Sequence, residues 1–271
     1  MRPREVAIAL AAVAVLATGC SRLTFVKPSA QRKSAERVAP EYRFRETEAG
    51  KRRMEMRRHV AAADRALREG QLDVAWSESQ AALKAAPDQA EPHSMVALVA
   101  SARGEAELAG RHYAEAARLA PSGSTLNNHG AWLCGNGRAA ESLRWFDGAL
   151  ADPNYGDQAG ALANAGTCAA MAGEHERAER DLRAALALEP ENTVALSAMA
   201  ERQFALGRYL EARAFSERRL AAAPATAQAL ELASRIEEKL GDSVAATRYV
   251  QRLRTEFPQA GNAIPGGNAQ P

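Results

Sequence analysis

Aromatic residues are scarce in this chain: Phe, Trp and Tyr together make up 5% of its 271 residues. The hydrophobic content is 46%, and much of it comes from Ala and Leu, which favour helices. Sheets are instead built largely from β-branched and aromatic residues. The composition therefore argues against a sheet-based fold and predicts an all-helical protein.

Residues that could carry out chemistry are also few. The five His residues are scattered without the spacing of metal ligands, and no Gly-rich phosphate loop follows a predicted strand. The acidic pairs fall on helix faces that are expected to be solvated. The sequence therefore predicts no catalytic residue, no metal site, no cofactor and no small-molecule substrate, and we do not expect an enzyme.

No apolar run is long enough to span a membrane. The longest run near the N-terminus, Val6 to Leu16, has about eleven residues and follows two Arg residues, so we predict a signal peptide over residues 1–19. Small residues then precede Cys20 in a pattern that resembles a bacterial lipobox, which implies a lipidated Cys20. Ser21 in place of Asp implies sorting to the outer membrane. Ordinary secretory cleavage, leaving a free Cys20, is the alternative.

Charge is distributed unevenly along the chain. Residues 21–58 hold twelve basic and five acidic side chains, whereas residues 59–271 hold 21 basic and 27 acidic ones. The basic stretch has no sustained hydrophobic period, so residues 20–55 are predicted to be a flexible tether from Cys20; the alternative for its last part is the beginning of the first helix. A solvated tether is the simpler interpretation, although such a stretch could also touch anionic lipid. We predict no nucleic-acid partner.

Glycine and proline recur together at intervals of about 34 residues. The glycines, at which a positive φ would end one helix, are Gly70, Gly104, Gly137, Gly173, Gly207 and Gly241. The prolines, which would end the next helix, are Pro87, Pro121, Pro153, Pro190, Pro224 and Pro258. Five residues after each glycine comes a small residue: Ala75, Ala109, Ser142, Ala178, Ala212 and Ala246.

This period is that of tetratricopeptide repeats (TPR). We therefore predict an all-α fold, a right-handed α-solenoid of six TPR helix pairs, over residues 56–258. Seven positions further on, a second small or apolar residue recurs on the same face, at Ala82, Ala116, Ala149, Ala185 and Leu253, and the fifth repeat departs from this second set at Arg219. A longer surface loop is expected from Asp152 to Gln158. Residues 259–271 are predicted to be a disordered tail.

The third and fourth repeats carry the most distinctive sequence. Residues 126–134 read L-N-N-H-G-A-W-L-C and are followed by Gly137-Arg138, and residues 161–168 read A-L-A-N-A-G-T-C. Together with the lipobox and the repeats, these motifs resemble the type IV pilus pilotins, the PilF/PilW lipoproteins. His129 stands where that family usually has Tyr, and Trp132 stands near the usual aromatic residue.

The resemblance implies a lipid-anchored protein on the periplasmic face of the outer membrane. Such a protein would bind the PilQ-like secretin subunit of the type IV pilus and promote its outer-membrane localisation and multimerisation. Two other functions remain open: a scaffold for another envelope or outer-membrane assembly, and a regulator of a cell-wall enzyme.

Four residues of these motifs are candidate partner-binding residues: Asn127, Asn128, Trp132 and Asn164. They lie on the predicted first helices of their repeats, which line the concave groove in this architecture. An Asn amide both donates and accepts, so it can pair with the backbone of an extended peptide. Alternatively, the Asn residues cap or bridge neighbouring helices.

Cys134 and Cys168 lie on the predicted first helices of consecutive repeats. In an oxidising periplasm, two thiols within reach are expected to form a disulfide. Two separate buried thiols remain the alternative, if the neighbouring helices hold the cysteines too far apart.

Overall fold

The computed structural model describes residues 47–261, and within this range the chain is helical with no strand. The predicted signal peptide, Cys20 and most of the predicted tether lie outside the described residues, as does most of the predicted tail. None of the helices in the described part of the chain is both long enough and apolar enough to cross a membrane.

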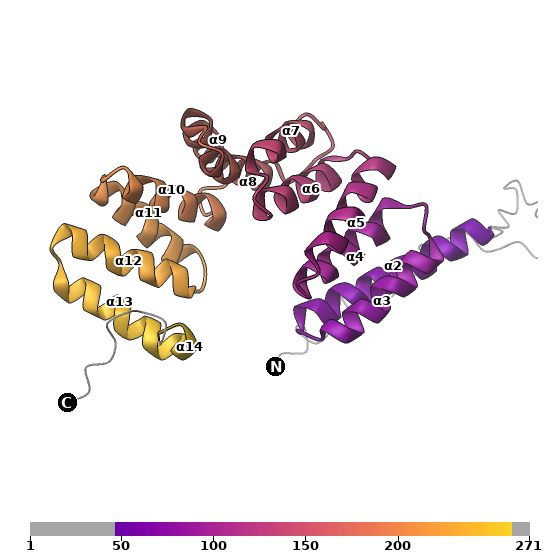
Figure 1. The fold of residues 1–271 in the computed structure, drawn as a ribbon, viewed down its shortest axis with the longest axis horizontal. Helices are drawn as coiled ribbons and strands as arrows, with labels where there is room; N and C mark the ends of the chain where they lie inside the picture. Colours follow the sequence, from indigo (N-terminus) through magenta and orange to yellow (C-terminus); the bar gives the residue numbers. More distant parts are fainter. Residues whose placement is uncertain (1–46, 262–271) are drawn as a thin grey trace, which may run out of the picture. The chain divides into compact units, whose positions relative to one another are not determined.

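The helices follow one another in antiparallel pairs (Figure 1). The first helices of the pairs are α2 (Glu48–Arg68), α4 (Ala90–Ala102), α6 (Gly123–Gly135), α8 (Gln158–Met171), α10 (Thr193–Ala205) and α12 (Ala227–Leu240). The second helices are α3 (Leu72–Ala85), α5 (Ala106–Leu119), α7 (Ala139–Leu150), α9 (His175–Leu188), α11 (Tyr209–Ala222) and α13 (Ser243–Glu256), followed by the short α14 (Pro258–Gly261).

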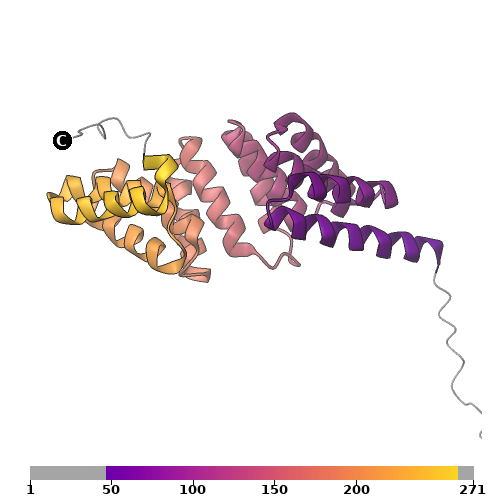
Figure 2. The same ribbon diagram turned by 90° about the horizontal axis from the view of Figure 1, so that it is seen from below.

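Each first helix packs against the second helix of its own pair and against the first helix of the next pair. The pairs therefore form a continuous row, in which the indigo and yellow helices of the two terminal pairs lie at opposite ends (Figure 2). Because each pair contacts mainly its neighbours, the core is a series of clusters along the row, as expected for a repeat protein.

The turns within the pairs confirm the predicted role of the recurring glycines. All six have positive φ, between 72° and 81°. At Gly70, the next residue, Gln71, donates its backbone N–H to the carbonyl of Ala66 at 2.8 Å and so caps the end of α2. A side chain would strain this left-handed backbone, which explains why glycine recurs there.

The predicted small residues lie where the two helices of a pair meet. All six of them, from Ala75 to Ala246, are at most 5% exposed. Ser142 is polar, but its hydroxyl donates to the carbonyl of Ala139 at 2.6 Å, so it is buried without an unpaired donor. Arg219, the departure in the fifth repeat, is also buried and donates to the carbonyls of Ala223 and Pro224 at the end of α11.

Two predicted boundaries need correction. The first helix begins at Glu48, inside the stretch predicted to be tether, because Thr47 caps it by accepting a hydrogen bond from the N–H of Gly50 at 3.1 Å. Glu48 and Lys51 then pair one turn apart at 2.8 Å. At the other end, the predicted tail starts within α14, which extends the helical region to Gly261.

The predicted loop between the third and fourth pairs spans the residues between α7 and α8. Asp152 accepts hydrogen bonds from the N–H groups of Gly123 at 2.7 Å and Asn154 at 2.9 Å, which lower the pKa of its carboxyl group. The ring of Tyr155 covers Gly123 so closely that a Cβ there would clash. The loop is therefore docked on the beginning of α6.

Candidate functional site

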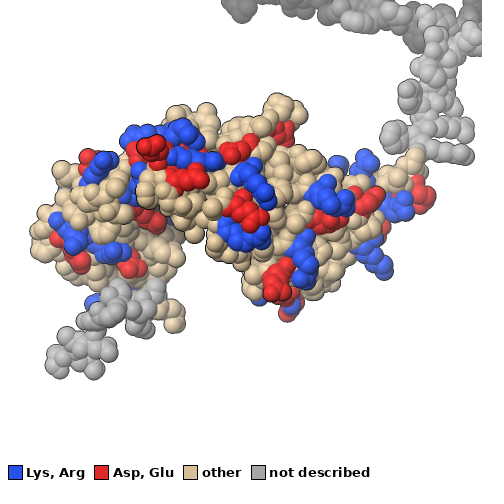
Figure 3. Space-filling model, turned by 45° about the horizontal axis from the view of Figure 1, so that its top comes forward, with Lys and Arg blue, Asp and Glu red and all other residues tan. Residues whose placement is uncertain are grey.

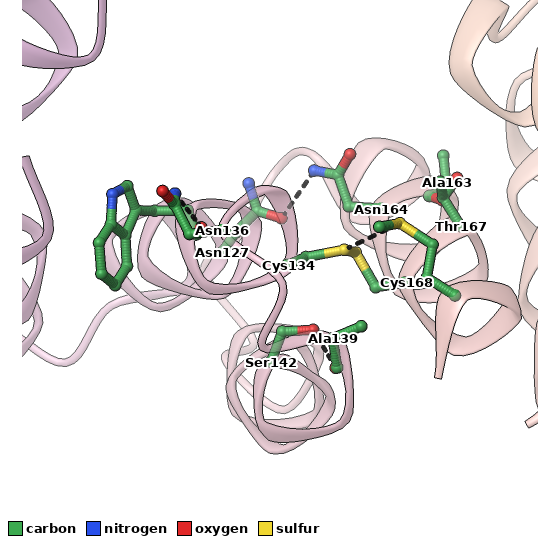
Figure 4. Close-up of a disulfide and its surroundings, with 11 residues drawn as sticks. Asn127, Cys134, Asn136, Ala139, Ser142, Ala163, Asn164, Thr167 and Cys168 are labelled. Carbon is green, nitrogen blue, oxygen red and sulfur yellow. Dashed lines mark hydrogen bonds between the residues drawn. A yellow bond between two sulfur atoms is a disulfide. The ribbon is translucent and has the colours of Figure 1, made fainter. Parts of the chain in front are cut away.

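The distinctive motifs of the third and fourth repeats meet where α6 packs against α8 (Figure 4). The side chain of Asn164 on α8 donates to the side-chain oxygen of Asn127 on α6 at 3.1 Å. Asn127 is buried and Asn164 is partly exposed. Asn127 thus bridges two first helices, which was the alternative to direct contact with a partner.

The two cysteines reinforce the same contact. Cys134 on α6 and Cys168 on α8 form a disulfide, and their Cα atoms are 5.8 Å apart. Both residues are at most 5% exposed and pack in a cluster with Leu143, Phe146 and Ala165. The structure thus contains the predicted pairing, and a covalent bond holds α6 and α8 together within one helical turn of Trp132 and Thr167.

The side chain of Trp132, on α6, packs against α5 and is held there by two contacts. Its indole N–H donates to the carbonyl of Ala106 at 3.1 Å. Its ring lies so close to Gly110 that a Cβ at position 110 would clash with it. Trp132 is partly exposed, so one edge can still face a partner, but its larger contribution is to pack the third pair against the second.

Asn128, which is partly exposed, lines a hollow of about 500 Å³ on the first helices α2, α4 and α6. The hollow combines polar groups with the apolar side chains of Val60, Met95 and Leu98. Its other lining residues are Ala90, Glu91, Ser94, Tyr113, Ala120, Ser122, Ser124 and Thr125. We call it the amino-side hollow.

A second hollow of about 440 Å³ lies on α8, α10 and α12, and Ser216 and Arg219 of α11 also line it. We call it the carboxy-side hollow. Its lining mixes polar side chains, such as those of Thr167, Ser197 and Glu201, with apolar ones. The remaining lining residues are Thr193, Val194, Ala198, Ala200, Thr226, Gln228, Ala229 and Leu232. The two hollows thus lie on the first helices, on either side of the disulfide-linked centre.

Most of these lining residues were missed by the motif-based prediction, although a sequence signal exists. Counted back from the turn glycines, Asn128 is nine residues before Gly137, and the residues at the same place in other repeats include Met95, Ala198 and Leu232. All four line one of the hollows. The place in the repeat is therefore a signal for this surface in four of the six repeats, whereas Ala61 and Asn164, at the same place in the other two, line neither hollow.

His129 is another buried polar residue of this region. Its ring stacks near Trp132, with centroids 6.0 Å apart, and meets Trp145 edge-on at 4.4 Å. Burial lowers its pKa, and the nearby charge of Arg138 lowers it further. His129 is therefore neutral near pH 7 and behaves as an aromatic packing residue.

The chemistry of the hollows suits binding. Hydroxyl, amide and carboxylate groups lie beside apolar side chains in both hollows, a combination that can contact both the backbone and the side chains of an extended peptide. Tyr113 lies under the amino-side hollow, where burial raises its pKa, so it remains an uncharged phenol. Within residues 47–261, no group of three or more His, Cys, Asp or Glu side chains is arranged to hold a metal ion.

No protein-family model and no curated protein matches the sequence. Solved structures do match. PilW, described as a widely conserved type IV pilus biogenesis factor, is 27% identical, with a TM-score of 0.68 over 76% of this chain and 96% of that chain. PilF from Pseudomonas aeruginosa is 21% identical, with a TM-score of 0.65 over 78% of this chain and 97% of that chain.

A tetratricopeptide repeat protein from Parabacteroides merdae is 17% identical and has a TM-score of 0.62, covering 74% of this chain and 78% of that chain. The two matches at the lower identities show the fold alone. The resemblance to PilF and PilW that the motifs suggested is thus confirmed in the structural comparison. The chain has the tetratricopeptide repeat solenoid fold.

Proposed function

We propose that this chain is a pilotin: a lipoprotein that binds the secretin subunit of a type IV pilus and promotes its localisation and multimerisation at the outer membrane. The observation that carries the proposal is the match to PilW, which extends over 96% of that chain at 27% identity. The sequence adds a lipobox-like segment ending at Cys20 and the motifs that meet at α6 and α8.

The proposed mechanism is tethering. Acyl chains on Cys20 hold the protein at the membrane, and the two hollows on the first helices hold a segment of the secretin subunit. Joining a subunit to one surface raises its local concentration there, which favours assembly of the ring without any chemical step. The disulfide links α6, which lines the amino-side hollow, to α8, which lines the carboxy-side hollow, and so limits how far the two hollows can move apart.

Deletion of the gene is expected to leave secretin as monomers and to reduce its amount in the outer membrane. Multimers that resist detergent can be measured by gel electrophoresis of separated membrane fractions. Complementation with the wild-type gene should restore them. Normal, correctly located multimers in the deletion strain would contradict the proposed function.

A second prediction concerns the hollows. Asn128→Arg and Ser197→Arg each place a long charged side chain in one hollow, and each is expected to reduce the secretin recovered by affinity purification at least about tenfold, equivalent to roughly 1.4 kcal/mol. Asn154→Arg is the matched control, because it adds the same charge to an exposed residue of the loop outside both hollows.

Equal recovery of secretin by Asn128→Arg, Ser197→Arg and Asn154→Arg would mean that secretin does not bind in the hollows on the first helices.

Mass spectrometry of the purified sample should also find an acylated Cys20. An acylated Cys20 with another envelope assembly as the partner would favour the scaffold function. Co-purification of a cell-wall enzyme, with cell-wall defects and intact pili, would favour the regulatory function.

A further inference from the structure

The first three turns of α2 carry a dense positive charge. Residues 48–58 contain five basic and two acidic side chains. All five basic residues are exposed: Lys51, Arg52, Arg53, Arg57 and Arg58. Figure 3 shows Lys and Arg side chains at the end of the array where α2 begins.

Elsewhere on the array, many Arg side chains are neutralised by acidic neighbours. Arg177 pairs with Asp147 at 2.6 Å, and Arg138 pairs with Glu141 at 2.7 Å. By contrast, Arg52, Arg53 and Lys84 form no ion pair with any residue of the described range. Within residues 47–261, their charge is therefore not neutralised by an acidic partner.

These three cations line one hollow of about 520 Å³ between the beginning of α2 and the end of α3. Arg52 and Arg53 come from the first turns of α2, and Lys84 comes from the last turn of α3. The only acidic residue in its lining is Asp88. The positive end of the α2 dipole lies at the same place and adds to the attraction for an anion.

An apolar side chain accompanies the cations. Met54 lies in the same helix turn as Arg52 and Arg53 and is 64% exposed. Basic residues around an exposed apolar side chain are typical of helices that lie on a membrane surface. The whole of α2 contains no Phe, Tyr or Trp, so it offers no ring on which a base of a single-stranded nucleic acid could stack.

We propose that this end of the array docks on an anionic phospholipid surface, with headgroup phosphates in the hollow formed by Arg52, Arg53 and Lys84. The inference does not depend on the pilotin function. It concerns a lipid surface and not a protein partner, and it uses a different part of the array from the two first-helix hollows. Docking would hold the first helix pair against the membrane and so fix the orientation of the array.

The test uses the full-length chain with Cys20→Ser, which removes the acylation site but leaves the rest unchanged. Sedimentation with phosphatidylcholine vesicles, with and without 30% phosphatidylglycerol, measures partition. The protein is expected to bind the anionic vesicles more strongly than the neutral ones. Adding Arg52→Gln, Arg53→Gln and Lys84→Gln is expected to reduce partition onto the anionic vesicles about a hundredfold, at about fivefold per cation.

The matched control carries Lys239→Gln, Arg248→Gln and Arg254→Gln, three exposed cations near the other end of the array. It has the same net charge as the test variant and is expected to keep its binding to anionic vesicles. Circular dichroism establishes that both variants are folded. Equal loss of binding in both variants would mean that net charge alone acts, which would overturn the proposal.

Two further outcomes would also overturn it. One is equal binding of the protein to neutral and anionic vesicles, which would assign binding to the apolar segment near the N-terminus. The other is a protein that shows no preference for anionic vesicles but binds a labelled single-stranded RNA, with this RNA binding lost on the Arg52, Arg53 and Lys84 changes. The site would then be one for nucleic acid.

Discussion

Reduction of the Cys134–Cys168 disulfide is expected to lower the free energy of unfolding by about 3 to 4 kcal/mol, because the bond closes a loop of 34 residues in the unfolded chain. For a helical region of this size, that corresponds to a fall in Tm of roughly 6 to 16 °C. Thermal unfolding followed by circular dichroism, with and without dithiothreitol, measures the difference.

The two sulfur atoms are buried, so reduction of the native protein should be slow. The state of the thiols must therefore be established by alkylation and mass spectrometry before each melt. A variant with Cys134→Ala and Cys168→Ala serves as the control, since its Tm should be low and insensitive to dithiothreitol. A fully reduced wild-type protein that melts at the oxidised temperature would contradict the prediction.

Leu182→Ala is expected to destabilise the array by about 2 to 5 kcal/mol. Leu182 lies on α9 and is 0% exposed. It packs in a cluster with Ala163 of α8, Ala185 of α9 and Met199 of α10. It also lies against Gly166 of α8, at a distance that leaves no room for a Cβ. Its removal would leave a cavity between two closely packed helices, which cannot easily close because the disulfide restrains α8.

Leu188→Ala is the matched control. Leu188 lies on the same helix and is 62% exposed, so its loss should change stability by less than about 0.5 kcal/mol. Urea unfolding of both variants gives the comparison. A similar loss of stability for Leu182→Ala and Leu188→Ala would mean that helix propensity, and not burial, sets the effect.

The helix pairs could be predicted because backbone geometry constrains single residues. A turn with positive φ requires Gly70 and its five equivalents, and close helix contact requires a small residue such as Ala109. Both requirements recur at the repeat period and are visible in one sequence. The start of α2 had a local signal too, since Thr47 is a typical N-cap residue, but the surrounding basic residues suggested a tether.

The contacts between repeats were harder to predict. Trp132 fits over Gly110, and Asn127 pairs with Asn164, yet these partners are separated by 22 and 37 residues and belong to different helix pairs. Which side chains meet depends on how one pair is rotated against the next. That rotation is a sum of many packing interactions, and no single residue type determines it. The two hollows arise from the same rotation.

The disulfide also determines how the array would respond to a mechanical load. If tension were applied to the two ends, the 34-residue segment that it closes could not lengthen. Those residues would otherwise extend to about 115 Å, at roughly 3.4 Å per residue, whereas the linked Cα atoms stay 5.8 Å apart. Force would pass from α6 to α8 through the sulfur atoms, and α7 would be shielded from it. Helices outside the linked segment have no such restraint and would extend before α7.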